Sequence, residues 1–283
     1  MALAKNKLTS PSIVIQILKQ HNLTLTKTYG QHFLVDENIR RKIIEAAALN
    51  KDDIVLEVGP GIGTLSEKIA PEVKKLWLIE LEKHFIPILK HTLTGNPAAE
   101  IMVADALKTD YGSLDPLPTK MVSNLPYNIA APLIIKLLAE CPSISKYTLM
   151  IPGEMGERLT AKLGSAHYSS LTLKISYLAD VKVLFKVSNQ VFLPKPKIKS
   201  VVIRIERHPN KQLDRPLFGV IEEAFRYRRK TIKNALLSAG FDRKHLDLAL
   251  EKAQIEPTAR PQNLTTPDFQ KLAEFLNNHT RNH

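Results

Sequence analysis

The sequence predicts an α/β fold: a mostly parallel sheet with helices on both faces, plus a small all-helical C-terminal domain. Short apolar segments alternate with amphipathic helical patterns as far as residue 151, which is typical of parallel strands buried on both faces. From about Pro209 onward only helical patterns remain. With 283 residues, 44% of them hydrophobic, the chain can form one medium and one small domain.

The elements follow in a regular order after a basic leader, residues 1–30. Residues 36–49 predict an amphipathic helix with Asp36 as its N-cap, because a short acidic side chain can accept a hydrogen bond from a free helical N–H group. The expected strands are 53–58, 75–81, 101–106, 120–124 and 146–151, with a late pair at 181–187 and 200–206. The expected helices are 64–70, 84–93, 131–140, 217–240, 243–253 and 266–278. We therefore expect domains at 1–207 and 208–283.

Positive charge is concentrated late in the chain. The formal net charge is +12 and the pI about 9.6, a balance that favours a polyanionic partner such as nucleic acid. Between Val181 and Lys233 there are 14 Lys and Arg against 4 Asp and Glu, a balance of +10. This stretch predicts a surface that contacts phosphates. The candidate RNA-binding residues are Lys195, Lys197, Lys199, Arg226, Arg228, Arg229, Lys230 and Lys233.

Composition also argues against several classes of protein. Cys141 is the single cysteine, so no intramolecular disulfide can form, which fits a reducing compartment such as the cytoplasm. No apolar run is long enough to span a membrane, and the N-terminal residues lack the pattern of a signal peptide. The histidines show no metal-ligand spacing, so we expect no metal. Without a sustained heptad repeat, we expect a monomer.

A glycine-rich turn follows the first predicted strand. In LEVGPGIGTL, residues 56–65, Gly59, Gly61 and Gly63 allow a tight turn and a close approach of the backbone to a ligand. A dinucleotide fingerprint would require another glycine where Thr64 stands, which makes a nicotinamide dehydrogenase improbable. No Lys-Ser or Lys-Thr pair follows the loop, which argues against a triphosphate.

Three acids accompany this turn. Glu80 ends the second predicted strand, where a carboxylate can accept hydrogen bonds from ribose hydroxyls. Asp105 lies at the end of the third, where it could accept from an adenine amino group, and Glu57 lies where a cationic group could bind. A single acid at a strand end is often only a solvated cap. Three of them beside one glycine turn favour an adenosyl ligand with a positive sulfonium, S-adenosylmethionine.

The fourth strand ends in VSNLPYN, residues 122–128. Asn124 and the Leu125 backbone carbonyl can accept hydrogen bonds from the amino group of a base, and Pro126 holds that carbonyl in an extended geometry. Tyr127 offers a ring for base stacking, worth about 1–3 kcal/mol. Such acceptors favour a pyramidal nitrogen and so localise a lone pair that is otherwise delocalised into the ring. The pattern therefore predicts methylation of an exocyclic amino group.

The ordered motifs resemble those of the KsgA/RsmA family, the small-subunit ribosomal RNA adenine dimethyltransferases. YGQHFLVDENI (29–39) is similar to the family's opening motif, and LEVGPGIGTLS, LIELE, ADAL and SNLPYN match its donor and catalytic motifs in order. VFLPKPKIKSVVIRI, AFRYRRKTIKNALL and RPQNLTTPDFQKLA are similar to its later signatures. The resemblance covers nearly the whole chain.

The resemblance implies a Rossmann-like class I methyltransferase sheet and a helical rRNA-binding C-terminal domain. It implies dimethylation at N6 of two adjacent adenosines in the 3′-terminal hairpin loop of small-subunit rRNA, with a role in small-subunit biogenesis. The implied catalytic residues are Asn124, Leu125, Pro126, Tyr127 and Phe192, with Phe192 covering the other face of the adenine. The implied cofactor-binding residues are His32, Leu34, Glu57, Gly59, Gly61, Glu80, Leu81, Asp105, Ala106 and Asn124.

Two departures and two alternatives remain. His32 stands where the family often has Asn, and IPGEMGERL (151–159) replaces the usual Q-K-E-V pattern, although Glu154 and Arg158 stand at matching places. Pro152 and Gly153 could reshape the loop near the target base. A large-subunit rRNA dimethyltransferase of the macrolide-resistance type shares the donor loop and the N-x-P-Y motif. A ribosome-assembly factor that acts mainly by binding the immature small subunit would share the basic patch.

Overall fold

The computed structural model describes residues 8–23 and 32–277, which form two compact units. The first unit contains the chain up to Gly156 together with Val181–Pro209. The second contains Glu157–Asp180 and the chain from Asn210 onward. Residues 157–180, predicted within the first domain, belong to the second unit, where helix α7 (Ser170–Leu178) packs with the C-terminal helices. None of the described helices is long and apolar enough to cross a membrane.

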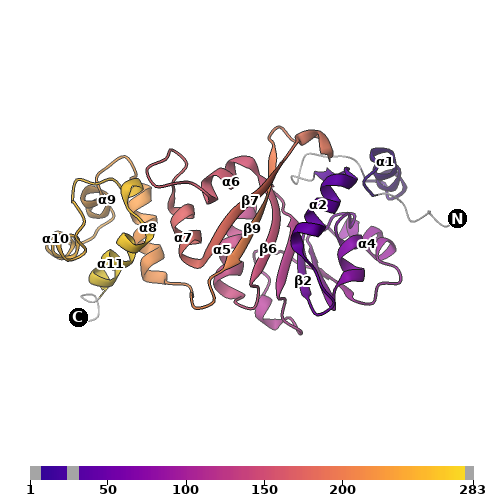
Figure 1. Ribbon diagram of the computed structural model, residues 1–283, viewed down its shortest axis with the longest axis horizontal. Coiled ribbons are helices and arrows are strands. Elements are labelled where there is room, and N and C mark those ends of the chain that lie inside the picture. The colour runs from indigo at the N-terminus through magenta and orange to yellow at the C-terminus, as the bar shows by residue number, and fades with distance from the viewer. Residues whose placement is uncertain (1–7, 24–31, 278–283) are drawn as a thin grey trace. The chain divides into compact units, whose positions relative to one another are not determined.

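A seven-stranded sheet of the described chain carries the first unit (Figure 1). Its strands, in spatial order, are β4 (Ala99–Val103), β3 (Lys75–Glu80), β2 (Ile54–Val58), β5 (Lys120–Asn124), β6 (Lys146–Pro152), β9 (Ser200–Arg207) and β7 (Ala179–Val187). The first five are parallel, and β9 runs antiparallel to β6. The predicted α/β fold with a mostly parallel sheet is confirmed.

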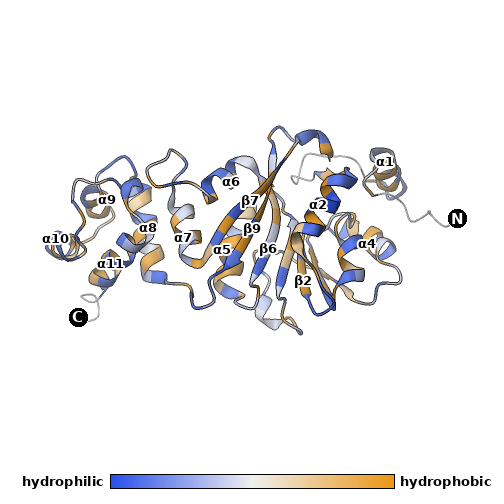
Figure 2. Ribbon diagram, in the orientation of Figure 1, coloured by the Kyte–Doolittle hydropathy of each residue, from blue (hydrophilic) through white to orange (hydrophobic). Residues whose placement is uncertain are grey.

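Helices cover both faces of the sheet. They include α2 (Glu37–Ala47), α3 (Ser66–Ile69), α4 (Ile86–Thr92) and α5 (Ala130–Glu140). Ile43 of α2 and Ile69 of α3 are fully buried in one cluster with Val55 and Leu76 of the strands. In Figure 2 the strands are predominantly orange and the helices carry both colours, as expected of apolar strands beneath amphipathic helices.

The chain after β4 turns earlier than predicted. The expected strand 101–106 is wrong at its end, because β4 stops at Val103. Asp105 closes a turn instead: its Oδ1 atom accepts from the Leu107 N–H at 2.9 Å, and its carbonyl accepts from the Thr109 N–H at 2.9 Å. An aspartate commonly bonds to a nearby backbone N–H in this way and thereby competes with strand pairing.

Helix α1 and the strand pair β1–β8 of the first unit were absent from the sequence-based prediction. Helix α1 (Pro11–Gln20) forms within the leader and buries Val14 and Leu18. Strand β1 (Phe33–Leu34) pairs antiparallel with β8 (Phe192–Leu193), so that residues far apart in the sequence lie side by side. The strand pair depends on contacts between distant residues, whereas α1 also has local signals, namely a proline in its first turn and the buried Val14 and Leu18 four residues apart.

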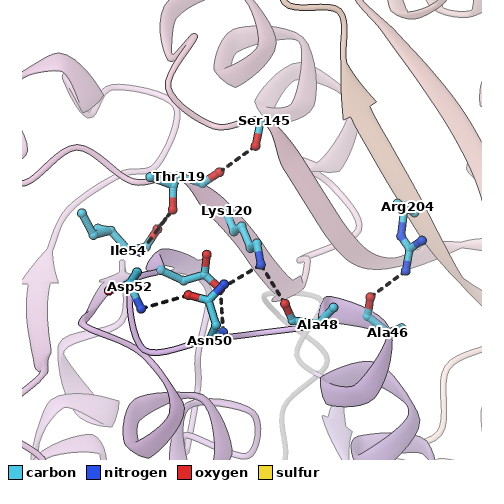
Figure 3. A network of polar contacts seen from close by, with 10 residues as sticks. Ala46, Ala48, Asn50, Asp52, Ile54, Thr119, Lys120, Ser145 and Arg204 are labelled. Atoms are coloured by element: carbon cyan, nitrogen blue, oxygen red, sulfur yellow. Dashed lines mark hydrogen bonds and ion pairs between the residues drawn. The ribbon is translucent and has the colours of Figure 1, made fainter.

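The C-terminal end of α2 is held to the sheet by two cations (Figure 3). Lys120 Nζ donates to the Ala48 carbonyl at 2.7 Å and pairs with Asp53 at 2.8 Å, and Arg204 donates to the Ala46 carbonyl at 2.8 Å. Cations at this end also interact favourably with the helix dipole. The C-terminal end of α2 is thereby fixed to β5 and β9.

Lys120→Met should lower the free energy of unfolding by about 2–3 kcal/mol, because it leaves the buried Asp53 carboxylate without its cation. Urea unfolding followed by circular dichroism measures the change. Lys136→Met is the control, since its partner Glu140 is 55% exposed and such pairs contribute little. A double variant Lys120→Met/Asp53→Asn should recover part of the loss. Equal stabilities of Lys120→Met and the control would contradict this account.

The second unit is helical. Besides α7 it contains α8 (Arg215–Arg226), α9 (Ile232–Ser238), α10 (Arg243–Lys252) and α11 (Thr266–Asn277), and α6 (Gly153–Leu159) reaches it from β6. The single helix predicted over 217–240 is wrong. Helix α8 ends at Arg226, and α9 begins after Thr231. Thr231 is the N-cap of α9, and its hydroxyl accepts from the Asn234 N–H at 3.3 Å.

Candidate active site

A pocket lies in the first unit at the carboxyl ends of β2, β3 and β5, beside the turn after β4. Ligands of parallel α/β sheets bind at this edge. All ten predicted cofactor-binding residues line the pocket, as do Leu125, Pro126 and Tyr127. The sequence motifs, although spread over about a hundred residues, therefore meet in one place.

The glycine turn brings two motifs into contact. Gly59 has φ +70° and Gly61 has φ +57°, backbone conformations that residues with a Cβ rarely adopt. A Cβ at Gly59 would lie 3.0 Å from Cδ and Cγ of Pro126, and one at Gly61 would lie 3.2 Å from the Phe33 ring. The turn therefore needs glycine both for its conformation and for its close packing against the N-L-P-Y segment.

Glu80 orders the loops around the pocket. Its Oε2 atom accepts from the Gly61 N–H at 3.0 Å and its Oε1 atom from the Glu82 N–H at 2.9 Å. Burial raises the pKa of this carboxyl, and the two backbone donors oppose the rise. Each oxygen of an ionised carboxylate has a further lone pair, so Glu80 can still accept hydrogen bonds from a ligand.

Glu57 is a buried acid beside the glycine turn. It is 2% exposed and accepts from the Ser66 hydroxyl at 2.6 Å. Burial raises the pKa of this carboxyl to about 8, with a smaller contribution from the nearby Glu80 charge. Glu57 is therefore mostly protonated at neutral pH unless a positive charge approaches it.

The substitution Glu57→Gln tests whether burial raises the pKa of Glu57 in the folded protein. Because the pKa of Glu57 is about 8 in the folded chain and 4.5 without burial, its contribution to stability is full below pH 4.5 and is lost as pH rises toward 8. Glutamine does not titrate and can still accept from Ser66. Between pH 6 and pH 8 the wild type should lose about 2 kcal/mol relative to the variant. Urea unfolding of both proteins at each pH measures this, and parallel pH profiles would refute it.

Asn124 presents an oxygen that has no partner in the part of the chain that the structure describes. Its Nδ2 atom donates to the His32 carbonyl at 3.1 Å, which fixes the orientation of the amide. The Oδ1 atom is buried and has no hydrogen-bond partner among the described residues. Buried polar atoms are normally paired, so an unpaired acceptor in a pocket indicates that a ligand donor completes it.

Tyr127 and His32 form the aromatic side of the pocket. Their ring centroids are 5.5 Å apart at an interplanar angle of 40°. The Tyr127 and Ser200 hydroxyls lie 2.6 Å apart, and His32 Nδ1 donates to the Pro194 carbonyl at 2.7 Å. Both rings are thus oriented by the segment that contains the predicted F-x-P-x-P motif.

Phe192 lies elsewhere. It is 3% exposed within β8, packs in the core with Leu34, and is not among the pocket-lining residues. Its ring is edge-on to His32 at 6.4 Å. Covering the second face of a base would require Phe192 to leave this position, so that role stays a prediction.

Comparisons with known proteins agree over almost the whole chain. The family model described as "RrnaAD: Ribosomal RNA adenine dimethylase" matches residues 22–278. The chain belongs to this family. A "Ribosomal RNA small subunit methyltransferase A" from Clostridium botulinum is 36% identical over 267 residues, which cover 92% of this chain and 97% of the relative. One from Alkaliphilus metalliredigens is 34% identical over 280 residues, 95% and 98% of the two chains.

Two solved structures are similar in fold. A dimethyladenosine transferase from Plasmodium falciparum has a TM-score of 0.74 and 28% identity, and the match covers 84% of this chain and 94% of that one. The 23S rRNA methyltransferase ErmE has a TM-score of 0.65 and 27% identity, with 86% and 99% covered. The chain is an enzyme of the methyltransferase class, as the sequence predicted.

Sequence reasoning missed several residues of this dimethylase pocket. Phe33 and Phe85 line it and pack edge to face, with ring centroids 5.7 Å apart. Thr64 and Leu65 also line it. Phe33, Thr64 and Leu65 are sequence neighbours of predicted motifs, which could have marked them as pocket residues. Apolar neighbours of a motif are usually core residues, however, so their place in the pocket was not predicted.

The predicted RNA-binding residues of the dimethylase divide between its two units. Lys195, Lys197 and Lys199 are exposed in the first unit. In the second, Arg226 pairs with Glu223 at 3.0 Å and Lys233 with Asp247 at 2.6 Å, which reduces the charge they offer to phosphates. The exposed residues there are Arg226, Arg228, Arg229 and Lys230. Their contact with RNA stays a prediction.

The departure at residues 152–156 has a packing explanation. Pro152 pairs with Ser200, whose hydroxyl contacts Tyr127, and the Gly153 N–H donates to the Lys199 carbonyl at 2.9 Å. A Cβ at Gly156 would lie 2.5 Å from Val201 Cγ2. The glycines therefore let the start of α6 approach β9 closely.

Proposed function

We propose that this enzyme transfers methyl groups from S-adenosylmethionine to N6 of two adjacent adenosines in the 3′-terminal hairpin loop of small-subunit rRNA, giving N6,N6-dimethyladenosine. The observation that carries the chemistry is the unpaired Oδ1 atom of Asn124. It is an acceptor without a donor, beside an aromatic ring and a glycine turn, as recognition of an exocyclic amino group requires.

The pocket fits the proposed donor by the chemistry of its residues. Glu80 would accept from ribose hydroxyls, Asp105 from the adenine amino group, and Glu57 would lie near the cationic part. His32 and Leu34 would complete the site. When bound, S-adenosylmethionine supplies an electrophilic methyl group and leaves as S-adenosylhomocysteine. A positive charge near Glu57 would favour its ionised form and lower its pKa.

The chain's own part in the reaction is to bind and orient the target amino group. Asn124 Oδ1 and the Leu125 carbonyl would accept its two hydrogens, which favours a pyramidal nitrogen with a localised lone pair. Tyr127 would stack on the base, and its bond to Ser200 limits the movement of its ring. No strong base is needed, because the nitrogen loses its proton after methylation. Alignment then supplies the main rate enhancement.

We propose small-subunit rRNA as the substrate because relatives at 34–36% identity are named small-subunit methyltransferases. Bases in a hairpin loop can be turned out at low cost, which suits the pocket. We propose that the first unit performs catalysis and that the second unit binds rRNA. The exposed lysines and arginines would contact phosphates of the immature subunit. We also propose that the enzyme acts as a monomer in the cytoplasm.

The test uses labelled S-adenosylmethionine with unmethylated small subunits, large-subunit RNA and duplex DNA. Nucleosides are released from each product and identified by mass. We expect N6,N6-dimethyladenosine from small subunits alone. Dimethyladenosine from large-subunit RNA would instead support the alternative of a large-subunit rRNA dimethyltransferase, and the fold is also similar to that of the 23S rRNA methyltransferase ErmE. Donor binding without any methylation would favour an assembly factor that acts by binding.

A further inference from the structure

Arg40 is a buried charge that the proposed chemistry does not use. It lies on α2, its side chain is 4% exposed, and it pairs with Glu37 and, at 2.7 Å, with Glu67. The same Nη1 atom lies 3.4 Å from the Thr64 carbonyl. A guanidinium removed from water is stable only while its partners stay in place. The position of Arg40 and that of its partners therefore depend on each other.

One partner of Arg40, Thr64, belongs to the wall of the donor pocket, and another, Glu67, follows three residues later. Thr64 and the next residue, Leu65, line the pocket directly. Glu67 lies on α3, one residue after Ser66, whose hydroxyl donates to Glu57 at 2.6 Å. Arg40 thus holds the segment that leads from the glycine turn into α3. We call this segment, residues 59–67, the donor loop.

The leader contacts the same arrangement through polar atoms. The Thr9 hydroxyl donates to Glu37 Oε2 at 2.9 Å, and the same oxygen also accepts a hydrogen bond from Arg40. Although burial raises the pKa of Glu37, the hydrogen bonds from Arg40 and Thr9 hold it below its usual value. A continuous set of contacts therefore runs from Thr9 through Glu37 and Arg40 to the donor loop.

The leader also contacts the pocket wall through apolar side chains. Leu8, Val14 and Leu18 are buried in one cluster with Phe33, Ile62 and Phe85. Phe33 and Phe85 line the pocket, and Ile62 lies within the donor loop. The packing of α1 thus supports the donor loop at Ile62 and the pocket wall at Phe33 and Phe85.

We propose that Arg40 is a positioning residue for the donor loop, and that the leader segment Leu8–Gln20 sets its position, so that a docked α1 gives the pocket its full affinity for the methyl donor. This inference rests on the proposed function, because it takes the donor pocket as given. Arg40 itself does not line the pocket. It acts through the Thr64 carbonyl and Glu67.

Arg40→Met in the full chain is the first test, with affinity for S-adenosylhomocysteine measured by calorimetry. Methionine fills similar space but cannot hold the loop. We expect the dissociation constant to rise at least tenfold, with kcat at saturating donor and KM for small subunits within threefold of wild type. Arg40→Lys should recover part of the affinity. Arg41→Met is the matched control, because Arg41 is the next residue of the same helix and is 58% exposed.

The split between affinity and kcat separates positioning from general destabilisation. All titrations are made well below the melting temperature, where each variant is fully folded by circular dichroism. If Arg40→Met does not fold, Glu67→Gln replaces it, since it weakens the same ion pair while keeping the side-chain shape. Dissociation constants within twofold of wild type for the folded variant overturn the proposal.

Thr9→Val tests the role of the leader. We expect a threefold or larger rise in the dissociation constant in the wild-type background and no further rise in Arg40→Met, because the two residues act in series. Additive effects would overturn the link through Arg40. A wild-type protein that binds no S-adenosylhomocysteine would instead refute the proposed function. Wild-type binding and methylation with an unchanged Arg40→Met would refute this inference alone.

Discussion

Asn124→Ala should lower the rate of methyl transfer at saturating donor by at least about 100-fold, the scale seen when one preorganised hydrogen-bonding group is removed from an active site. The variant loses the Oδ1 acceptor and also the 3.1 Å bond to the His32 carbonyl. Single-turnover measurements at saturating donor exclude changes in donor affinity from the comparison. Unmethylated small subunits serve as substrate.

Asn124→Asp separates the two losses. Aspartate keeps acceptor oxygens at this position but cannot donate to the His32 carbonyl. If the acceptor carries the chemistry, the Asp variant should retain at least tenfold more activity than the Ala variant. Equal rates would assign the effect to the lost tether. An Ala variant with more than a tenth of the wild-type rate would remove Asn124 from the catalytic residues.

Gly59→Ala should abolish donor binding at concentrations that saturate the wild type, which corresponds to a rise in the dissociation constant of at least about 100-fold, or roughly 2.7 kcal/mol. The new Cβ would lie 3.0 Å from two atoms of the Pro126 ring, so the glycine turn and the N-L-P-Y segment must separate. The change also requires alanine at φ +70°. Calorimetric titration with S-adenosylhomocysteine measures the result.

Gly95→Ala is the matched control for this substitution. Gly95 has φ +83°, and a Cβ there would meet no atom within 4 Å. Both variants therefore bear the cost of a left-handed alanine, about 1–2 kcal/mol, but only Gly59→Ala disturbs the pocket. We expect both variants to be folded at the temperature of the titration and to differ strongly in donor affinity. Equal donor affinity of the two variants would contradict the packing argument.

The pocket residues were predictable from the sequence because parallel strands place their carboxyl ends at one edge. Glu57, the glycine turn, Glu80 and Asn124 each lie at the end of a short apolar segment, and such segments are recognisable by local composition. Sheet topology then brings the ends together without any further information from the sequence. The order of the motifs along the chain also made the family recognisable from the sequence.

The features that were missed depend on contacts between distant residues. The predicted helix 217–240 is divided into α8 and α9, and Thr231 caps the start of the second helix. Helix α1 is stabilised by the apolar cluster it shares with Phe33 and Phe85. The burial of Phe192 follows from the pairing of β8 with β1, and that of Arg40 from Glu67, 27 residues later. No local pattern marks these partners.

The pairing of β1 with β8 also bears on when the enzyme becomes active during its own synthesis. His32 and Tyr127 take their hydrogen-bond partners from Pro194 and Ser200, and β9 follows immediately. A nascent chain that ends before Pro194 holds every predicted donor-binding residue but lacks both groups that orient these two rings. Translation therefore completes the donor-binding residues well before the target-base site, and the enzyme gains its catalytic geometry only after most of its sequence has left the ribosome.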